Sequence, residues 1–267
     1  MSNLRTTLVQ ADLRWEDPEA NCRLLDEQLG SLDATTTDLI VLPEMFATGF
    51  TMNSREMAEP MASSRSVAWM REQARRRGCV VTGSVAVTEA GDYYNRLIWA
   101  TPDGEVVHYD KRHLFRMAGE HERYGMGLNR AVVELKGFRI LLTVCYDLRF
   151  PVWLRQQPAQ DEHFEYDALL CVANWPAPRR GPWRTLLQAR AIENLCYVIG
   201  VNRVGEDAKG LAYAGDSMLV DFKGDPLIDE ARDQPFIRTG SLEREALSQF
   251  RDKFPAWMDA DRFQLER

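Results

Sequence analysis

Short apolar runs alternate with amphipathic stretches along the whole chain. The apolar runs end at turn residues, which is typical of buried β-strands, and the stretches between them carry apolar residues at helical spacing. Strands are predicted within residues 5–13, 36–46, 79–115, 138–148, 166–175 and 216–228, helices within 17–32, 66–78, 151–157 and 243–257, and a helix followed by a strand within 183–205. Strands that alternate with helices predict an α/β layered fold.

Turn-forming residues divide the longer segments. The sequences EAGD and PDGE break residues 79–115 into successive strands, and a Lys-Gly-Asp turn makes residues 216–228 a hairpin. Pro18 lies at an early position of the first predicted helix, and Pro255 ends the last one. No linker, low-complexity tract or short repeat interrupts the pattern, so residues 1–267 are expected to form one domain.

The composition is that of an ordinary globular protein, with 45% hydrophobic and 27% charged residues in 267 positions. The net charge of −7 argues against nucleic acid or an anionic membrane as a partner, because both need clustered basic surface. The N-terminal sequence lacks the pattern of a secretory signal, and no window approaches the roughly 18 apolar residues of a membrane span. The sequence therefore predicts a cytoplasmic protein.

The cysteines and histidines suggest neither a disulfide framework nor a metal site. Five cysteines are present, an odd number without a C-x-x-C pair, which fits a reducing compartment. His108, His121 and His163 form no metal-ligand spacing, and no glycine-rich phosphate loop occurs. No metal or organic cofactor is expected.

Three polar residues stand at or just past the end of a predicted strand, namely Glu44, Cys145 and Asn174. Ligand sites of α/β sheets gather at such ends. A buried cysteine is as readily a small core residue as a nucleophile, and a nucleophilic thiol needs a base or a cation nearby. Glu44 is either a polar strand end that reaches water or that base, and Lys111 is either an exposed edge-strand residue or that cation.

The sequences LIVLPEMFATGF, YDKRHLF and LLTVCYDLRFP, in this order, resemble the three signature blocks of the nitrilase superfamily of carbon–nitrogen hydrolases. VANWPAPR, LLQARAIENLCYVIGVNRVG and YAGDSMLVDFKGDPL resemble later blocks, so the resemblance covers essentially the whole chain. The segments KRHLF…AGEH, CYDLRFPVW and ANWPAPR most resemble the corresponding segments of bacterial omega-amidases. The resemblance implies a single-domain α-β-β-α sandwich that forms a homodimer, and amide hydrolysis without a cofactor. The aromatic tail FPAWMDADRF is either part of that dimer contact or a helix end packed on the surface.

The resemblance also implies roles for individual residues. It makes Glu44 the general base, Lys111 the cation over the reacting carbonyl and Cys145 the nucleophile. It matches Glu120, in the AGEH segment, to a second glutamate that holds substrate and lysine, with Glu122 as the rival position.

Elementary chemistry agrees with these roles. Glu44 would take the thiol proton as the sulfur attacks an amide carbonyl, and Lys111 with the backbone N–H of Tyr146 would hold the oxyanion. Ammonia would then leave, and water would hydrolyse the thioester on Cys145 to a carboxylic acid.

Substrate contacts are predicted from Phe46, Phe115, Arg149, Asn174 and Trp175. The omega-amidase branch implies a small dicarboxylic monoamide, such as a 2-oxo acid omega-amide, whose distal carboxylate requires a cation. The sequence offers Arg112, Arg116, Arg149, Arg179 and Arg180 without ranking them. Arg149 has a structural alternative, which is an ion pair with Asp147 or another buried acid.

Three alternative functions remain open at this point. His113 shares a strand face with Lys111 if the segment is extended, and a Cys145–His113 dyad would make the protein an acyl transferase. An enzyme of the nitrilase fold would also suit nitriles or N-carbamoyl compounds. The third alternative is a non-catalytic protein that binds a small acid, although such a protein has no need for a nucleophile.

Overall fold

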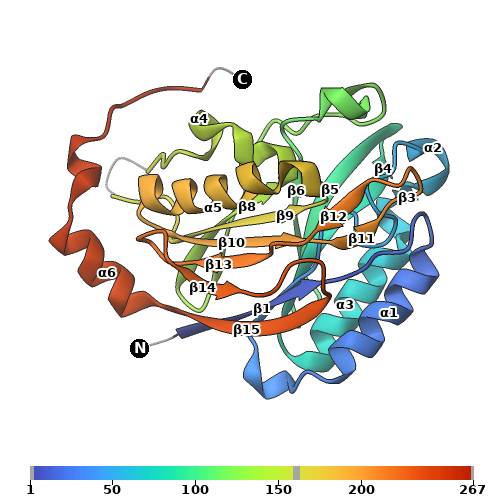
Figure 1. Cartoon of the computed structure of the whole chain (residues 1–267), viewed down its shortest axis with the longest axis horizontal. Coiled ribbons are helices and arrows are strands. Elements are labelled where there is room, and N and C mark those ends of the chain that lie inside the picture. The colour runs from blue at the N-terminus through green and yellow to red at the C-terminus, as the bar shows by residue number, and fades with distance from the viewer. Residues whose placement is uncertain (1–2, 159–162, 266–267) are drawn as a thin grey trace.

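The computed structural model describes residues 3–158 and 163–265, which form two β-sheets packed face to face (Figure 1). The first sheet has seven strands in the order β15-β1-β2-β4-β5-β6, with β3 paired to β4. They are β1 (Asn3–Gln10), β2 (Leu39–Val41), β3 (Glu59–Pro60), β4 (Val80–Glu89), β5 (Asp92–Ala100), β6 (Val106–Asp110) and β15 (Phe236–Glu243).

The second sheet has six strands in the order β14-β13-β10-β9-β8-β7. They are β7 (Val132–Leu135), β8 (Phe138–Val144), β9 (Ala168–Ala173), β10 (Tyr197–Asn202), β13 (Met218–Val220) and β14 (Pro226–Asp229). The strands β11 (Val204–Glu206) and β12 (Ala212–Ala214) form a separate hairpin.

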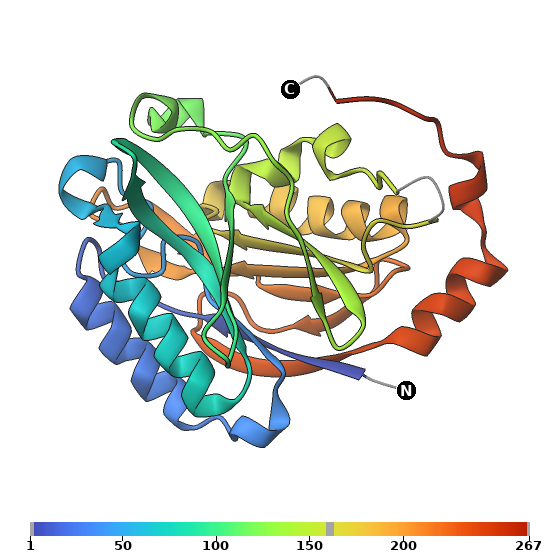
Figure 2. The same cartoon turned by 180° about the vertical axis from the view of Figure 1, so that it is seen from behind.

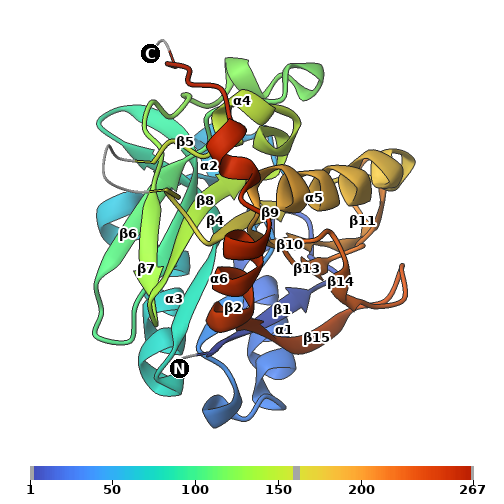
Figure 3. The ribbon, with the colours of Figure 1, turned by 90° about the vertical axis from the view of Figure 1, so that its left-hand side faces the viewer.

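Helices cover the outer face of each sheet. The helices are α1 (Pro18–Gly30), α2 (Ser54–Met57), α3 (Arg65–Arg77), α4 (Pro151–Leu154), α5 (Arg180–Asn194) and α6 (Arg244–Lys253). The helices α1 and α3 lie side by side on the first sheet (Figure 2). Figure 3 shows these two helices on one side of the sheets and α5 on the other. The layers follow the order α-β-β-α, which confirms the predicted fold class.

Local sequence explains where the long helices begin and end. The side chain of Asp17 accepts a hydrogen bond from the N–H of Ala20 (2.9 Å) at the start of α1. Ser64 accepts one from the N–H of Val67 (3.1 Å) at the start of α3. Gly78 ends α3 with φ of 62°, a left-handed conformation that glycine adopts without steric cost.

The strand β2 shows why the apolar runs are uninterrupted. Leu39 and Val41 belong to the core that spans both sheets, whereas Ile40 and Leu42 pack with residues of α1 and α3. Successive side chains of a strand point to opposite faces, so a strand buried on both faces is apolar at every position. The chain therefore reaches Glu44, which follows β2, deep inside the molecule.

The structure confirms the predicted strands and helices, with one helix shorter than expected, and adds α2, β3, β7, β12 and β15, which were not predicted. The helix expected within residues 151–157 is the single turn α4. The strand β15 was not predicted, because it lies at the edge of its sheet and is half exposed, so it lacks a continuous apolar run. Among the described residues, no helix has both the length and the apolar character that crossing a membrane requires.

Candidate active site

Side chains that follow four different strands meet in one buried cluster. Glu44 follows β2, Lys111 follows β6, Cys145 follows β8 and Asn174 follows β9. The ammonium of Lys111 donates a hydrogen bond to Oε1 of Glu44 at 2.8 Å. The backbone N–H of Asn174 donates to Oε2 of the same carboxylate at 2.7 Å. The structure thus brings together residues that are far apart in the sequence.

A second carboxylate, that of Glu120, completes the surroundings of the lysine. Nζ of Lys111 donates to both oxygens of Glu120, at 3.0 and 2.9 Å. The backbone N–H of Phe115 holds the same carboxylate at 2.6 Å. Glu120 is fully buried, whereas Glu122 is exposed. Of the two glutamates considered from the sequence, Glu120 is the one beside Lys111.

An asparagine that the sequence reasoning missed joins the two glutamates. Nδ2 of Asn95, on β5, donates to Glu44 at 2.7 Å and to Glu120 at 3.2 Å. The hydroxyl of Ser84 donates to Oδ1 of Asn95 (2.8 Å) and accepts from the N–H of Met45 (2.8 Å). A signal was present, because Asn95 is a polar residue at the head of a buried apolar run.

Cys145 occupies a strained turn at the end of β8. Its φ is 48°, in the left-handed region that residues with a Cβ rarely adopt. It begins a short 3-10 helix, Cys145–Arg149, and 8% of its surface is exposed. Tyr146 is the second residue of this helix, and the first N–H groups of a helix have no partner within it. The Tyr146 N–H is therefore available beside the sulfur.

The charges around the cysteine favour a neutral thiol and a charged lysine. Burial raises the pKa of Cys145 well above the ordinary value, the carboxylate of Glu44 raises it further, and Lys111 opposes both. Burial lowers the pKa of Lys111, but the charges of Glu120 and Glu44 outweigh it and leave that pKa well above the usual range. Burial raises the pKa of Glu120, while Lys111 lowers it. These effects favour loss of the thiol proton as the sulfur attacks rather than before it.

A pocket of about 120 Å³ opens onto Cys145. Its apolar lining comes from Trp15, Phe50, Met52, Phe115, Trp175, Leu211 and Tyr213. Tyr146, Asn174, Asp207, Lys209 and two arginines add polar and charged surface. An apolar cavity with a few polar groups is typical of a small-molecule site. Phe115, Arg149, Asn174 and Trp175, four of the residues predicted to contact substrate, line this pocket.

Phe46 does not line this pocket, so the expectation that it contacts substrate is wrong. Its ring is fully buried and packs against Trp69, with ring centroids 5.5 Å apart. The chain turns sharply between the two phenylalanines, with positive φ at Met45 (43°) and Gly49 (70°). This turn directs Phe50 into the pocket instead.

The five candidate arginines fall into two that line the pocket and three that do not. Arg149 and Arg179 line the pocket, where their guanidinium groups lie 4.7 Å from the Trp175 ring and 5.4 Å from the Phe115 ring, respectively. Neither forms an ion pair with any described residue, so the suggested pair of Arg149 with Asp147 is wrong.

The other three arginines are engaged or remote. Arg180 binds Asp216 at 2.9 and 2.6 Å. Arg112 donates to the carbonyl of Gly127 at 3.1 Å. Arg116 is exposed and does not line the pocket.

The side chain of His113 is held by groups other than Cys145. Its Nδ1 lies 2.8 Å from Oδ1 of Asp147, and its ring stacks on Phe150 with centroids 3.8 Å apart. Within the described residues, the hydrogen bonds and ring contacts of His113 are with Asp147, Phe150 and Trp153, and Cys145 is not among these partners. The geometry therefore favours Glu44 over His113 as the group that accepts the thiol proton.

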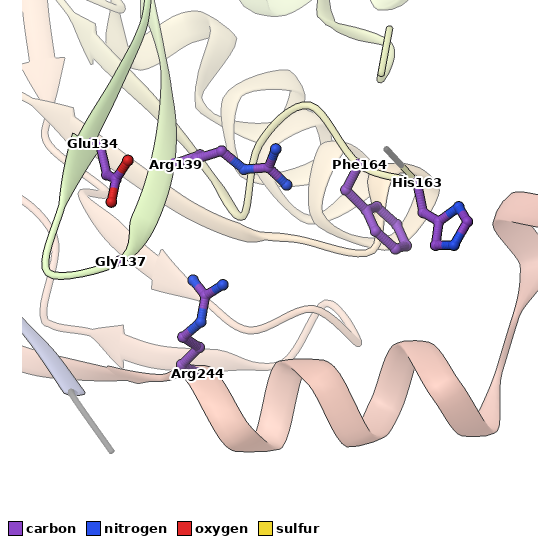
Figure 4. A pocket seen from close by; sticks show the side chains of 6 residues that line it. All are labelled: Glu134, Gly137, Arg139, His163, Phe164 and Arg244. Carbon is purple, nitrogen blue, oxygen red and sulfur yellow. The ribbon is translucent and has the colours of Figure 1, made fainter. Parts of the chain in front are cut away.

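Two larger cavities lie elsewhere. One, of about 470 Å³, is lined by Glu134, Arg139, Phe164 and Arg244 among others, and the guanidinium groups of its arginines face the same space (Figure 4). These arginines form ion pairs with Asp167.

Within residues 3–158 and 163–265, no three His, Cys, Asp or Glu side chains are arranged to hold a metal ion.

The arrangement around Cys145 suits acyl transfer. A thiol lies next to a carboxylate that accepts protons, and an ammonium and a backbone N–H lie where charge develops on a carbonyl oxygen. The pocket excludes most water from this chemistry, because Cys145, Lys111 and both glutamates are buried.

Comparison with known proteins identifies the family. The sequence model of the carbon-nitrogen hydrolase family matches residues 5–252. The chain is 47% identical to omega-amidase YafV of Yersinia enterocolitica over 99% of this chain and 100% of that protein. It is 31% identical to 2-oxoglutaramate amidase of Bacillus subtilis over 94% of this chain and 95% of that protein.

A solved structure agrees over the whole length. The CN-hydrolase superfamily protein XC1258 of Xanthomonas campestris, whose crystal structure has an arsenic adduct in the active site, is 47% identical and superimposes with a TM-score of 0.95, covering 100% of both chains. Fold and sequence agree, and the chain belongs to the carbon-nitrogen hydrolase family of the nitrilase superfamily.

Proposed function

We propose that this protein is an omega-amidase, an amidohydrolase that releases ammonia from the terminal amide of a small dicarboxylic acid, such as a 2-oxo acid omega-amide. The observation that carries the proposal is the buried contact of Lys111 with Glu44 and Glu120 beside Cys145, at the end of a pocket with two arginines that form no ion pair with a described residue. The names of the relatives with 47% and 31% identity support the same substrate class.

Acylation begins with attack of the Cys145 sulfur on the amide carbonyl carbon. As the S–C bond forms, the thiol proton passes to Glu44, which is the general base. Negative charge develops on the carbonyl oxygen, where Lys111 and the N–H of Tyr146 stabilise it. The C–N bond then breaks, the nitrogen takes the proton from Glu44, and ammonia leaves.

Deacylation uses the same groups. Glu44 takes a proton from water as the water oxygen attacks the thioester carbonyl. The C–S bond breaks, the sulfur regains a proton from Glu44, and the carboxylic acid leaves. Glu120 holds the Lys111 ammonium in place and balances its charge throughout both steps.

The far carboxylate of the substrate is assigned to Arg149 and Arg179. Both cations lie in the pocket without a carboxylate partner among residues 3–158 and 163–265, and their contacts with aromatic rings hold them there. A guanidinium donates two parallel hydrogen bonds to the two oxygens of a carboxylate. A neutral amide group has only one oxygen and cannot accept both. The side chain of Phe115 and that of Trp175 would flank the short carbon chain between the two ends.

The test is a panel of short substrates with ammonia detection. It includes the omega-amides 2-oxoglutaramate, glutaramate and succinamate, the neutral amides pentanamide and butanamide, the corresponding nitriles, and N-carbamoyl amino acids. We expect the carboxylated omega-amides to give the highest kcat/KM. A preference for nitriles or N-carbamoyl compounds would replace the proposed activity by another of the same fold.

We also propose that the protein is a cytoplasmic homodimer. Phe254 and Met258, in the aromatic C-terminal tail, expose 54% and 66% of their surfaces, and a second copy would cover them. The five free cysteines fit a reducing compartment. Sedimentation of the wild type and of Phe254→Ser tests the dimer, and a monomeric wild type at micromolar concentration would contradict it.

A further inference from the structure

We infer that Asp147 is a positioning residue that fixes the turn of Cys145 against the segment carrying Lys111. This inference rests on the proposed function only in treating Cys145 as the nucleophile. Asp147 has no exposed surface and lies two residues after Cys145 in the same short helix. The mechanism described above gives this buried acid no role.

The carboxylate of Asp147 is saturated by donors. Oδ2 accepts from the backbone N–H of Val144 at 3.0 Å and from the hydroxyl of Tyr109 at 2.8 Å. Oδ1 accepts from the backbone N–H of His113 at 2.9 Å and from its ring Nδ1 at 2.8 Å. A carboxylate offers about four acceptor positions, and all four partners can donate. Nδ1 of His113 therefore carries a proton.

These donors belong to two different parts of the site. Val144 immediately precedes Cys145, so the first bond holds the turn of the nucleophile. Tyr109 and His113 flank Lys111 on either side in the sequence, so the other bonds hold the segment of the lysine. One buried carboxylate thus links the two segments that must act on the same carbonyl group.

The turn needs such support. The left-handed φ of Cys145 is unfavourable for a residue with a side chain, and it persists only where the surroundings hold it. The surroundings of Asp147 are rigid, because the His113 ring stacks on Phe150 with an angle of 7° between the planes. The indole N–H of Trp153 donates to the Tyr109 hydroxyl at 3.2 Å, which fixes that group as well.

This linkage gives His113 a role that differs from that of a base. A proton on Nδ1 is donated to Asp147, and the ring contacts recorded within the described residues are with Phe150 and Trp153 rather than Cys145. His113 therefore supports the carboxylate that holds both segments. Asparagine has an N–H₂ group at nearly the position of Nδ1 and is not a base, so it should replace this role of histidine but not a catalytic one.

The main experiment compares Asp147→Asn with Asp167→Asn. In Asp147→Asn, an N–H₂ group replaces one carboxylate oxygen and meets groups that themselves donate hydrogen bonds, so the bonds to that oxygen are lost. We therefore expect kcat to fall about 100-fold while KM changes less than about 3-fold. Asp167 is a matched control, because it is also buried and accepts hydrogen bonds from Arg251 (2.7 Å) and the N–H of Arg139 (3.0 Å). Its variant should lower Tm and keep kcat within about 3-fold of the wild type.

A second pair of variants decides the case if Asp147→Asn does not fold. His113→Ala should lower kcat by about 3-fold to 10-fold, and His113→Asn should restore most of it. The rate of alkylation of Cys145 by iodoacetamide should follow the same order. This reagent needs no amide substrate, so it tests positioning even if the wild type hydrolyses no omega-amide.

Three results would overturn the inference. One is an unchanged kcat in folded Asp147→Asn, and another is the same loss of kcat in Asp167→Asn. The third is a loss of more than about 1000-fold in His113→Ala without recovery in His113→Asn, which would make His113 a base.

Discussion

Nζ of Lys111 lies 2.8 Å from Oε1 of Glu44, and neither side chain has any exposed surface. The same ammonium also contacts Glu120 at 2.9 Å. Burying three ionisable groups costs free energy of folding. If this part of the core served stability alone, apolar residues in their place would serve as well or better. The cost has a functional explanation, because an ammonium and a carboxylate held without water act strongly on a reacting carbonyl group.

The first prediction concerns the loss of the buried cation. Lys111→Met leaves Glu44 and Glu120 without their shared partner, so the free energy of unfolding should fall by about 3–5 kcal/mol. The value of kcat should fall by about 10²–10³-fold or more, because an oxyanion donor is lost. Denaturant unfolding and steady-state kinetics measure the two effects. Lys223→Met removes an exposed lysine and should change neither.

The second prediction separates the roles of the glutamates. Glu44→Gln should lower kcat by about 10²–10⁴-fold, because the general base is lost. Glu120→Gln should have a smaller effect, about 10-fold to 100-fold, because it weakens only the support of Lys111. Glu122→Gln changes an exposed side chain and serves as the control. Equal activity of Glu44→Gln and the wild type would remove Glu44 from the mechanism.

The third prediction concerns pH. Burial and the charge of Glu44 raise the pKa of Cys145, so its thiol stays protonated at a pH where an ordinary cysteine is already half ionised, about 8.5. The rate of alkylation by iodoacetamide should therefore keep rising from about pH 7 to about pH 10 without a plateau. Mass spectrometry of Cys145 measures this rate. A plateau below about pH 8 would mean that the thiolate is present at rest.

The fourth prediction concerns substrate recognition. Arg149→Gln and Arg179→Gln should each lower kcat/KM for glutaramate by about 10-fold to 100-fold, since each loses a charge-assisted hydrogen bond. Activity on pentanamide, which has no carboxylate, should change much less. Arg116→Gln is the matched control outside the pocket. If the variants lose activity equally on both amides, these arginines do not recognise the carboxylate.

The sequence predicts the residues of the site better than it predicts how they face one another. Glu44, Cys145 and Asn174 stand at strand ends, where ligand sites of α/β sheets gather. Glu44 follows a strand of the first sheet and the other two follow strands of the second, so the packing of the two sheets brings them together. Residues 46 and 50 are both phenylalanine, so residue type does not distinguish them. The sharp turn of the chain with positive φ at Met45 and Gly49 decides which of the two enters the pocket. Such a turn depends on tertiary contacts that no local pattern carries.

Polar residues inside strands and helices were missed for a related reason. Asn95 reaches Glu44 and Glu120 only because β5 pairs with β4 and projects its side chain toward them. Asp147 follows the nucleophile, yet its partners lie 34 and 38 positions earlier in the sequence. The edge strand β15 was not predicted, because a partly exposed strand shows only a weak alternation of apolar and polar residues.

The most direct test of the account is the mass of the protein during turnover. We expect wild-type enzyme, quenched in acid while hydrolysing glutaramate, to carry the acyl group of the substrate on Cys145, with one ammonia lost for each group added. Cys145→Ala should carry none and should not hydrolyse the amide. Turnover by the alanine variant at the wild-type rate, or an acyl group on a different residue, would contradict the assignment of Cys145 as the nucleophile.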